Sequence, residues 1–174
     1  MPLTASMTTV KFLDQGLKSL RVQPIPFLMA KQLIECHYYS HSIPGGTMLT
    51  FGVFLNSQLL GAITFGVGPF DVYSLVEGAR SDDCLTLTRL LLSDELLGNS
   101  ESRVIGIVLR ALKQHTNLKF IVTYADTSSG HTGIIYRATN WTFARMSSST
   151  PLYDLGDGKP KHSVVSVMSW VLTL

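Results

Sequence analysis

The chain has 174 residues, of which 45% are hydrophobic and 15% charged, and its formal net charge is +2. This composition excludes a disordered chain, which needs low hydrophobicity and high charge. The length predicts one compact domain over residues 1–174. Two cysteines, Cys36 and Cys84, are too few for a disulfide framework, and no secretory leader is apparent ahead of them. We therefore expect a reducing cytosolic compartment with both thiols buried as small hydrophobic side chains.

A hydropathy scan could misread residues 36–70, which contain no Asp, Glu, Lys or Arg. Pro44-Gly45-Gly46 and Asn56-Ser57-Gln58 interrupt this stretch, so no run reaches the roughly 18 to 20 apolar residues of a membrane-spanning helix. We expect a soluble protein without a membrane segment. Blocks of Lys and Arg, which are typical of nucleic-acid-binding tails, are absent from the sequence. This excludes binding through bulk charge but not DNA as a substrate.

The first half is expected to be rich in strands. Residues 1–19 have no clear period and are expected to be partly mobile. The predicted elements are a strand at 20–25, a helix at 26–38, a hairpin of strands at 49–55 and 59–67, and a long strand at 85–92. Pro26 suits the first turn of the helix, and Asn56-Ser57-Gln58 suits the turn of an antiparallel hairpin.

The second half is expected to alternate helices and strands. Its predicted elements are a helix starting near Asn99 or Ser100, a buried strand at 120–124 closed by Asp126, a helix at 131–139, and strands at 142–147 and 164–172. The first of these helices follows from an apolar stripe at the i, i+3, i+4, i+7 spacing. A strand, helix, strand order implies a parallel pair joined by a right-handed crossover.

The resulting order, β-α-β-β-β-α-β-α-β-β, resembles the GNAT acyltransferase fold. The expected fold class is α/β, with a mixed central sheet flanked by helices in a single domain. The sheet should be antiparallel in its first half and should splay between the two parallel central strands, at 85–92 and 119–125.

The first candidate constellation is Cys36-His37-Tyr38-Tyr39-Ser40-His41 at the end of the first predicted helix. If that helix continues, His37 and His41 share a face at a spacing that suits a metal. The segment lacks the Glu that would make the signal specific, and a histidine in a surface or core role explains it equally well. Tyr38 and Tyr39 could likewise be core aromatics.

The second constellation runs from Thr123 to Gly133 and places Asp126 at the carboxyl end of a buried strand. Ligand crevices of open α/β sheets form at such strand ends. His131 and Tyr136 add two functional side chains nearby. The alternative is that Asp126 only caps a turn or a helix and that the glycines only serve the backbone.

The third constellation is the entry to the helix near residue 100. The start of a helix offers amide groups and a positive dipole end to a phosphate, and we expect a pyrophosphate on the amides of Ser102 to Gly106. Arg103-x-x-Gly106-x-Val108 resembles the acetyl-CoA loop of GNAT proteins, Q/R-x-x-G-x-G/A, with Val108 departing from it. Arg89, in an otherwise apolar strand, should face the same cleft or pair with Asp94 or Asp126.

Together these segments resemble the Mom family of bacteriophage DNA-modification proteins. The resemblance spans residue 20 to the C-terminus in element order, and the residues that carry it are Cys36-His37-Tyr38, Tyr124-Ala125-Asp126, Gly130-His131-Thr132-Gly133, Ile135-Tyr136 and Ala138-Thr139-Asn140-Trp141. The resemblance implies a transferase that converts adenine to N6-(carbamoylmethyl)adenine in phage DNA. This modification shields the DNA from host restriction, so the expected location is the cytoplasm of the host bacterium.

The resemblance also implies roles for individual residues. His37, Tyr38, Asp126 and Tyr136 correspond to the family's active-site and proposed iron-binding set, whereas Arg89 and Ser102 correspond to its acyl-CoA contacts. Acetyl-CoA or a related acyl-CoA and iron are thus the expected cofactors. The chain is short for this family, so DNA-binding elements at the periphery could be reduced.

The residues themselves add a chemical argument. The lone pair of adenine N6 is delocalised into the ring, so its modification needs a base or a strong electrophile within hydrogen-bond reach, and Asp126 is the candidate base. A base within duplex DNA must first be flipped into a pocket. The aromatic side chains expected to stack on it are Tyr38, Tyr39, Tyr124, Tyr136 and Trp141, with His131 close by. The expected partner is therefore double-stranded DNA with a flipped adenine.

Alternatives remain open at this point. His37, Tyr38, Asp126 and Tyr136 could hold iron or could form an acid and base network without a metal. The protein could instead be a GNAT N-acyltransferase for a small amine or a protein, or a non-catalytic DNA-binding protein on the same fold. The sequence leaves the donor of the modifying group and the oligomeric state open, a homodimer included.

Overall fold

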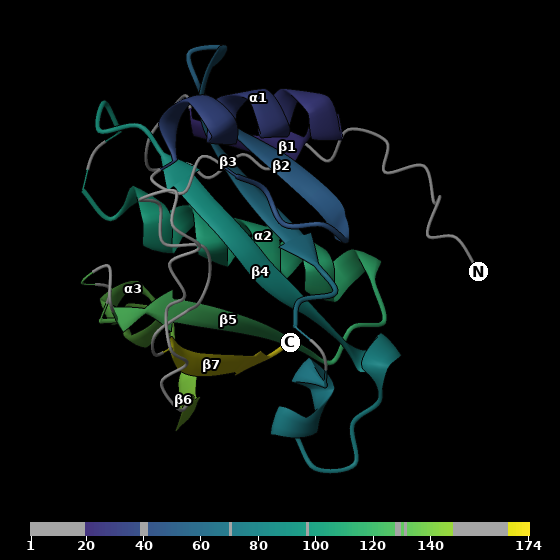
Figure 1. Cartoon of the computed structure of the whole chain (residues 1–174). Helices are drawn as coiled ribbons and strands as arrows, with labels where there is room; N and C mark the ends of the chain where they lie inside the picture. Colours follow the sequence, from purple (N-terminus) through teal and green to yellow (C-terminus); the bar gives the residue numbers. More distant parts are fainter. Residues whose placement is uncertain are drawn as a thin grey trace, which may run out of the picture.

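The computed structural model describes residues 20–38, 42–69, 71–96, 98–127, 130, 132–147 and 167–174. Seven strands form one sheet in the order β1-β2-β3-β4-β5-β7-β6 (Figure 1). The strands are β1 (Leu20–Pro24), β2 (Thr47–Leu55), β3 (Gln58–Gly66), β4 (Cys84–Leu92), β5 (Phe120–Asp126), β6 (Thr142–Met146) and β7 (Val167–Thr173). The helices are α1 (Phe27–His37), α2 (Ser100–His115) and α3 (Ile134–Ala138), with two 3-10 turns, η1 (Val72–Leu75) and η2 (Ser81–Asp83).

The pairing of the strands confirms the predicted fold class. β4 and β5 are parallel, and every other neighbouring pair of this sheet is antiparallel. The β2–β3 hairpin turns on Asn56 and Ser57, which both have positive φ (48° and 73°), as a two-residue turn requires. The predicted three-residue turn is therefore one residue too long, because Gln58 already pairs with Leu55.

Helices cover both faces of the sheet (Figure 1). α1 packs on β2 and β3 through Ala30 and Ile34, which are fully buried. On the opposite face, α2 buries the predicted stripe, including Val104, Val108 and Leu112, against the main core. We call these two sides of the sheet the α1 face and the α2 face.

The excursion between β3 and β4 covers the first parts of β4 and β5 on the α1 face. Val72 of η1 packs with Cys84, Phe120 and Val122, which lie on that face of β4 and β5. Asp83 anchors the end of the excursion, because its carboxylate accepts a hydrogen bond from the Arg80 backbone N–H (2.9 Å) and pairs with the Lys119 ammonium (2.9 Å). These two partners hold the pKa of Asp83 below its usual range.

Three expectations are corrected by the structure. The helix predicted over 131–139 spans only Ile134–Ala138, because Gly133 has a left-handed backbone (φ +70°) that interrupts it. Asn99 occupies the predicted cap position of α2 with a left-handed backbone, but its side chain makes no capping hydrogen bond. Cys84 is buried as expected, whereas Cys36 is exposed on α1.

No helix within the described ranges combines the length and the hydrophobicity that are needed to cross a membrane.

Candidate functional site

The two central strands separate where the sequence predicted a splay. β4 and β5 pair only from Cys84 with Phe120 to Leu87 with Thr123, and β5 continues along β7 alone. At the point of separation, the buried Thr123 hydroxyl donates a hydrogen bond to the Leu87 carbonyl (3.3 Å). Beyond it, the β5-facing edge of β4 has no strand partner among the described residues. Backbone groups at that edge are therefore available to a ligand.

A β-bulge at Thr88 decides which face of β4 carries the charged side chain. Thr64 pairs with Arg89, and Phe65 pairs with Leu87, so Thr88 is the extra residue. The Thr88 and Thr64 hydroxyls hydrogen-bond to each other across the bulge (2.8 Å). Bulges re-aim the side chains that follow them. Here the bulge turns Arg89 from the α2 face, where Leu87 lies, to the α1 face.

Arg89 is held in place on the α1 face by backbone carbonyls and an aromatic ring. Its Nε donates to the Ser42 carbonyl (3.0 Å), and its Nη1 donates to the Thr88 carbonyl (2.8 Å). Its guanidinium carbon lies 5.2 Å from the centre of the Tyr38 ring. The alternative role of Arg89, an ion pair with Asp94 or Asp126, does not occur among the described residues. These partners, two carbonyl oxygens and an aromatic ring, carry no net charge. Arg89 therefore keeps its positive charge beside the splay.

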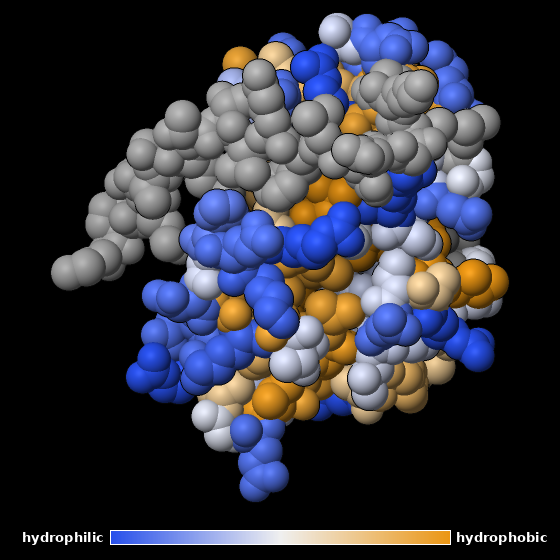
Figure 2. Space-filling model, turned by 180° about the vertical axis from the view of Figure 1, so that it is seen from behind, coloured by the Kyte–Doolittle hydropathy of each residue, from blue (hydrophilic) through white to orange (hydrophobic). Residues whose placement is uncertain are grey.

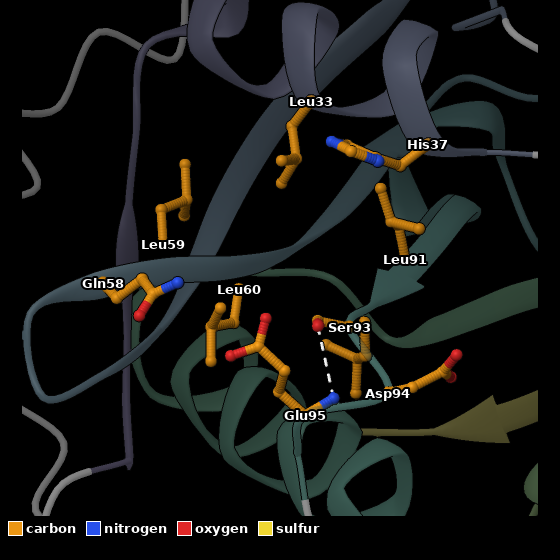
Figure 3. A pocket seen from close by; sticks show the side chains of 10 residues that line it. Leu33, His37, Gln58, Leu59, Leu60, Leu91, Ser93, Asp94 and Glu95 are labelled. Carbon is orange, nitrogen blue, oxygen red and sulfur yellow. Dashed lines mark hydrogen bonds between the residues drawn. The ribbon is translucent and has the colours of Figure 1, made fainter.

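His37 lies next to Tyr38 but lines a separate cavity of about 490 Å³ (Figure 3). The imidazole extends from the end of α1 into this cavity beside Leu33 and Leu91. The opposite wall is polar and includes Asp94 and Glu95 from the turn that follows β4. Tyr38, Asp126 and Tyr136 are not among its lining residues. This cavity is thus lined by only one of the four residues of the predicted active-site set, and the catalytic roles of the four stay predictions.

Asp126 is the last residue of β5 and is half-buried. Phe120, Val122 and Tyr124 alternate along β5 on the α1 face, so the pleat places Asp126 on that face as well. Asp126 and Arg89 thus lie on the same side of the sheet, each beyond the last residue through which its strand pairs with the other. Burial raises the pKa of Tyr124, and the positive charge of Arg145 opposes this rise.

The predicted aromatic residues divide between the two faces. Tyr136 packs on Trp141 and Trp170, with ring centres 5.4 and 6.4 Å apart, and belongs to the core of the α2 face. Trp141 is only 5% exposed, and Tyr124 packs beneath the η1 excursion. Trp141 is thus buried and Tyr124 partly buried, and their roles in stacking on a base stay predictions. Tyr39, His41 and His131 lie outside the described residues.

The resemblance of Arg103-x-x-Gly106-x-Val108 to an acetyl-CoA loop is corrected by the position of α2. The helix begins at Ser100, and the Arg103 amide already bonds to the Asn99 carbonyl (3.2 Å). Arg103 and Gly106 are therefore helical, and Val108 faces the core. Among the backbone amides of Ser102 to Gly106, which were expected to bind a pyrophosphate, only the Ser102 amide lies in the first turn of α2. Backbone N–H groups in that turn have no carbonyl partner within the helix.

The segment that leads into this turn is Glu95-x-x-Gly98-x-Ser100, and the sequence reasoning missed it. Its spacing places a glycine and a small residue where the Q/R-x-x-G-x-G/A pattern has them, directly after β4 and before the first turn of α2. The helix start near Asn99, which the sequence did predict, was the signal that could have found it. Glu95 departs from the pattern, because it puts a negative charge where that pattern has Gln or Arg.

Within the part of the chain that the structure describes, no three His, Cys, Asp or Glu side chains come together as metal ligands. Tyr136 also packs on the face of the sheet opposite to Tyr38. The described members of the expected iron set therefore do not fit a metal centre.

Comparisons with known proteins agree with these observations. Residues 19–170 match the Mom protein family. The chain is 30% identical over 152 residues to the methylcarbamoylase mom of Escherichia phage Mu, which covers 86% of this chain and 62% of that protein. The chain thus spans less than two thirds of the length of this relative.

Solved structures share the fold at low sequence identity. The Arabidopsis thaliana protein NAA60 in complex with acetyl-CoA superposes with a TM-score of 0.64 at 10% identity, covering 90% of this chain and 99% of that one. A GNAT family acetyltransferase from Elizabethkingia anophelis with acetyl-CoA bound gives a TM-score of 0.57 at 12% identity, with the same two coverages. These similarities confirm the predicted GNAT-like sheet.

Proposed function

Since the chain belongs to the Mom protein family, we propose that it is a transferase that modifies adenine in phage DNA at N6. The proposed product is N6-(carbamoylmethyl)adenine, which would protect the DNA from restriction in the host cell. The observation that carries the proposal is that a positive side chain and a carboxylate lie on the same face of the sheet, beyond the point where β4 and β5 separate. The bulge at Thr88 turns Arg89 to the α1 face, where Asp126 ends the neighbouring strand.

In this proposal Asp126 acts as the base. Adenine N6 becomes a nucleophile only if a proton leaves as the new bond forms, and a half-buried carboxylate at the end of β5 can accept that proton. Arg89 supplies a fixed positive charge that binds and orients the negative or polarised part of the donor, because its guanidinium is held by two carbonyls and the Tyr38 ring. A charge that is already positioned costs no reorganisation during the reaction.

We propose an acyl-CoA as the ligand of the splay. Two observations support the fit: the open backbone edge of β4 beyond Leu87, which can hydrogen-bond an amide-bearing arm, and the first turn of α2 at Ser102, which can receive a phosphate. An acyl-CoA bound there would supply an activated acyl group. Simple acyl transfer to N6 would give an amide and not the carbamoylmethyl amine, so we assign the acyl-CoA a binding site and leave the donor of the carbamoylmethyl group open. We propose no step through iron, because the described members of the predicted donor set do not fit a metal.

The sharpest test is mass spectrometry of nucleosides from the DNA of bacterial cells that express the protein. The parent should give a deoxyadenosine heavier by one carbamoylmethyl group, and Asp126→Asn should not. Asp82→Asn, which changes an exposed carboxylate on η2, is the matched control and should remain active. Thermal melts of all three proteins should agree, because a carboxylate at a crevice edge contributes little to stability.

Three other outcomes would redirect the proposal. The fold alone also suits an N-acyltransferase for a small amine or a protein, and this would appear as unmodified DNA together with acetylation of an amine by the purified protein. Modified DNA in the Asp126→Asn strain would remove Asp126 from the mechanism. Unmodified DNA together with duplex binding would favour a non-catalytic binding protein.

A further inference from the structure

A surface at the β6 edge of the sheet, which the proposed function does not use, combines positive and apolar side chains. It lies on α3 and β6 and comprises Ile134, Arg137, Phe143, Arg145 and Met146, which are all exposed. We call it the α3–β6 surface. Three of its members are large hydrophobic residues with exposures of 68%, 48% and 49%. Seen from the side opposite α1, apolar and polar atoms lie next to each other at the edge where α3 and β6 are (Figure 2).

The charges on this surface have one sign. The sequence contains no Asp or Glu between Asp126 and Asp154, whereas it contains Arg137 and Arg145. Among the described residues, neither arginine forms an ion pair. By contrast, Arg80 pairs with Asp82 (2.8 Å) and Lys31 with Glu35 (3.7 Å). Unpaired arginines next to exposed apolar side chains suit a partner that is a polyanion with apolar faces.

The position of the surface relates it to the candidate site. Arg145 lies opposite Ser169 of β7, which lies opposite Tyr124 of β5, so the three residues form one row across the sheet. Tyr124 is on the α1 face, and therefore Arg145 is on the same face as Asp126, two residues further along β5. Phe143 projects to the other side of the β6 edge and packs edge-on against Trp170 (5.5 Å). The packing fixes the direction in which its ring is presented.

We infer that the α3–β6 surface docks duplex DNA, with Arg137 and Arg145 on backbone phosphates and Phe143 on the apolar edge of a sugar or base. The inference rests on the proposed function, and it names the surface that brings DNA to the site. Phosphate contacts position a duplex without reading its sequence. Arg145 lies on the same face of the sheet as Asp126, and Phe143 lies on the other face. A duplex that contacts both would therefore lie across the β6 edge of the sheet.

The test is the binding of a fluorescent duplex, followed by anisotropy between about 50 and 200 mM salt. Each phosphate contact adds about 0.9 to the slope of log K against log salt concentration. Arg145→Ala and Arg137→Ala should each weaken binding several-fold and lower the slope by about one. Arg110→Ala, which removes an exposed arginine from α2, should change neither quantity.

Phe143→Ala tests the apolar part of the surface. It should weaken binding several-fold and leave the salt slope unchanged, because an apolar contact releases no counterions. Phe27→Ala is its matched control, since Phe27 on α1 is 47% exposed and Phe143 is 48% exposed. Circular dichroism should show that all variants keep the parent fold.

The outcomes separate this inference from the proposed function. Unchanged binding and slope in both arginine variants, or no duplex binding by the parent, would overturn the inference. A Phe143→Ala variant that changes the oligomeric state instead of DNA binding would identify the surface as an interface between copies and would also overturn it. Nucleoside mass spectrometry of the parent tests the proposed function alone, because its result does not depend on which surface binds DNA.

Discussion

Replacing Arg89 by alanine tests whether the bulge on β4 builds the site. The change removes two hydrogen bonds to carbonyl oxygens, at 3.0 and 2.8 Å, and a cation–π contact at 5.2 Å. Each hydrogen bond contributes about 1 kcal/mol net, and a contact of this kind contributes about 0.5–1 kcal/mol. In the variant, water can bond to the two freed carbonyls, and the cost of partly burying a charge no longer applies. Together these effects restore about 1 kcal/mol of the free energy of unfolding.

The expected net loss is thus about 1.5–2 kcal/mol in the free energy of unfolding. For a chain of this length that corresponds to a fall of about 4–7 °C in Tm. DNA modification should fall much further than stability, because the positive charge at the splay is lost. Arg89→Lys keeps the charge, but an ammonium cannot bond both carbonyls and stack on Tyr38 together. We therefore expect it to be intermediate in both measurements.

Thermal melts followed by circular dichroism, together with nucleoside mass spectrometry, measure the two effects separately. Arg21→Ala is the matched control, because within the described part of the chain this exposed arginine makes one hydrogen bond, to the Ser57 hydroxyl (3.1 Å). Its loss should cost less than about 0.5 kcal/mol. An Arg89→Ala protein that melts with the parent and still modifies DNA would refute the reasoning. A large loss of stability together with unchanged DNA modification would show that Arg89 has a structural role only.

Three further predictions concern the fold. Gly133→Ala should lower the free energy of unfolding by about 2 kcal/mol or more, because the backbone there is left-handed and an added Cβ would lie 2.6 Å from the Trp170 indole. Urea titration measures the loss, and stability equal to the parent would contradict this prediction. The lowered pKa of Asp83 adds stability that is fully present above the unfolded value of about 3.9 and is lost as the pH falls through the folded value. The parent should therefore lose more stability than Asp83→Asn below about pH 4, and parallel pH curves would argue against it. A thiol reagent should modify the exposed Cys36 in the native protein. It should react with Cys84 only after unfolding, because Cys84 is buried and its thiol has a raised pKa. Rapid reaction of both thiols in the native protein would contradict the burial of Cys84.

The sequence by itself determined the kind and order of the elements. The apolar stripe of α2, the continuous apolar run of β5 and the turn at Asn56 are local patterns, and each predicts its element without knowledge of its neighbours. The order of these elements then restricted the topology to a mixed sheet with one parallel crossover. For the same reason, the splay beyond Leu87 was predictable as part of that fold.

Tertiary structure alone decided which side chains meet. The bulge at Thr88 arises from the pairing of β4 with β3, and no pattern within β4 shows that Arg89 leaves the face on which Leu87 lies. Trp141 reads as a substrate-stacking residue in the sequence, yet contacts with Tyr136 bury it in the core. Local periodicity reports how a segment folds, whereas the face and partner of each side chain depend on residues distant in the sequence. The element order and the candidates Arg89 and Asp126 could therefore be predicted, but the face on which each of these side chains lies could not.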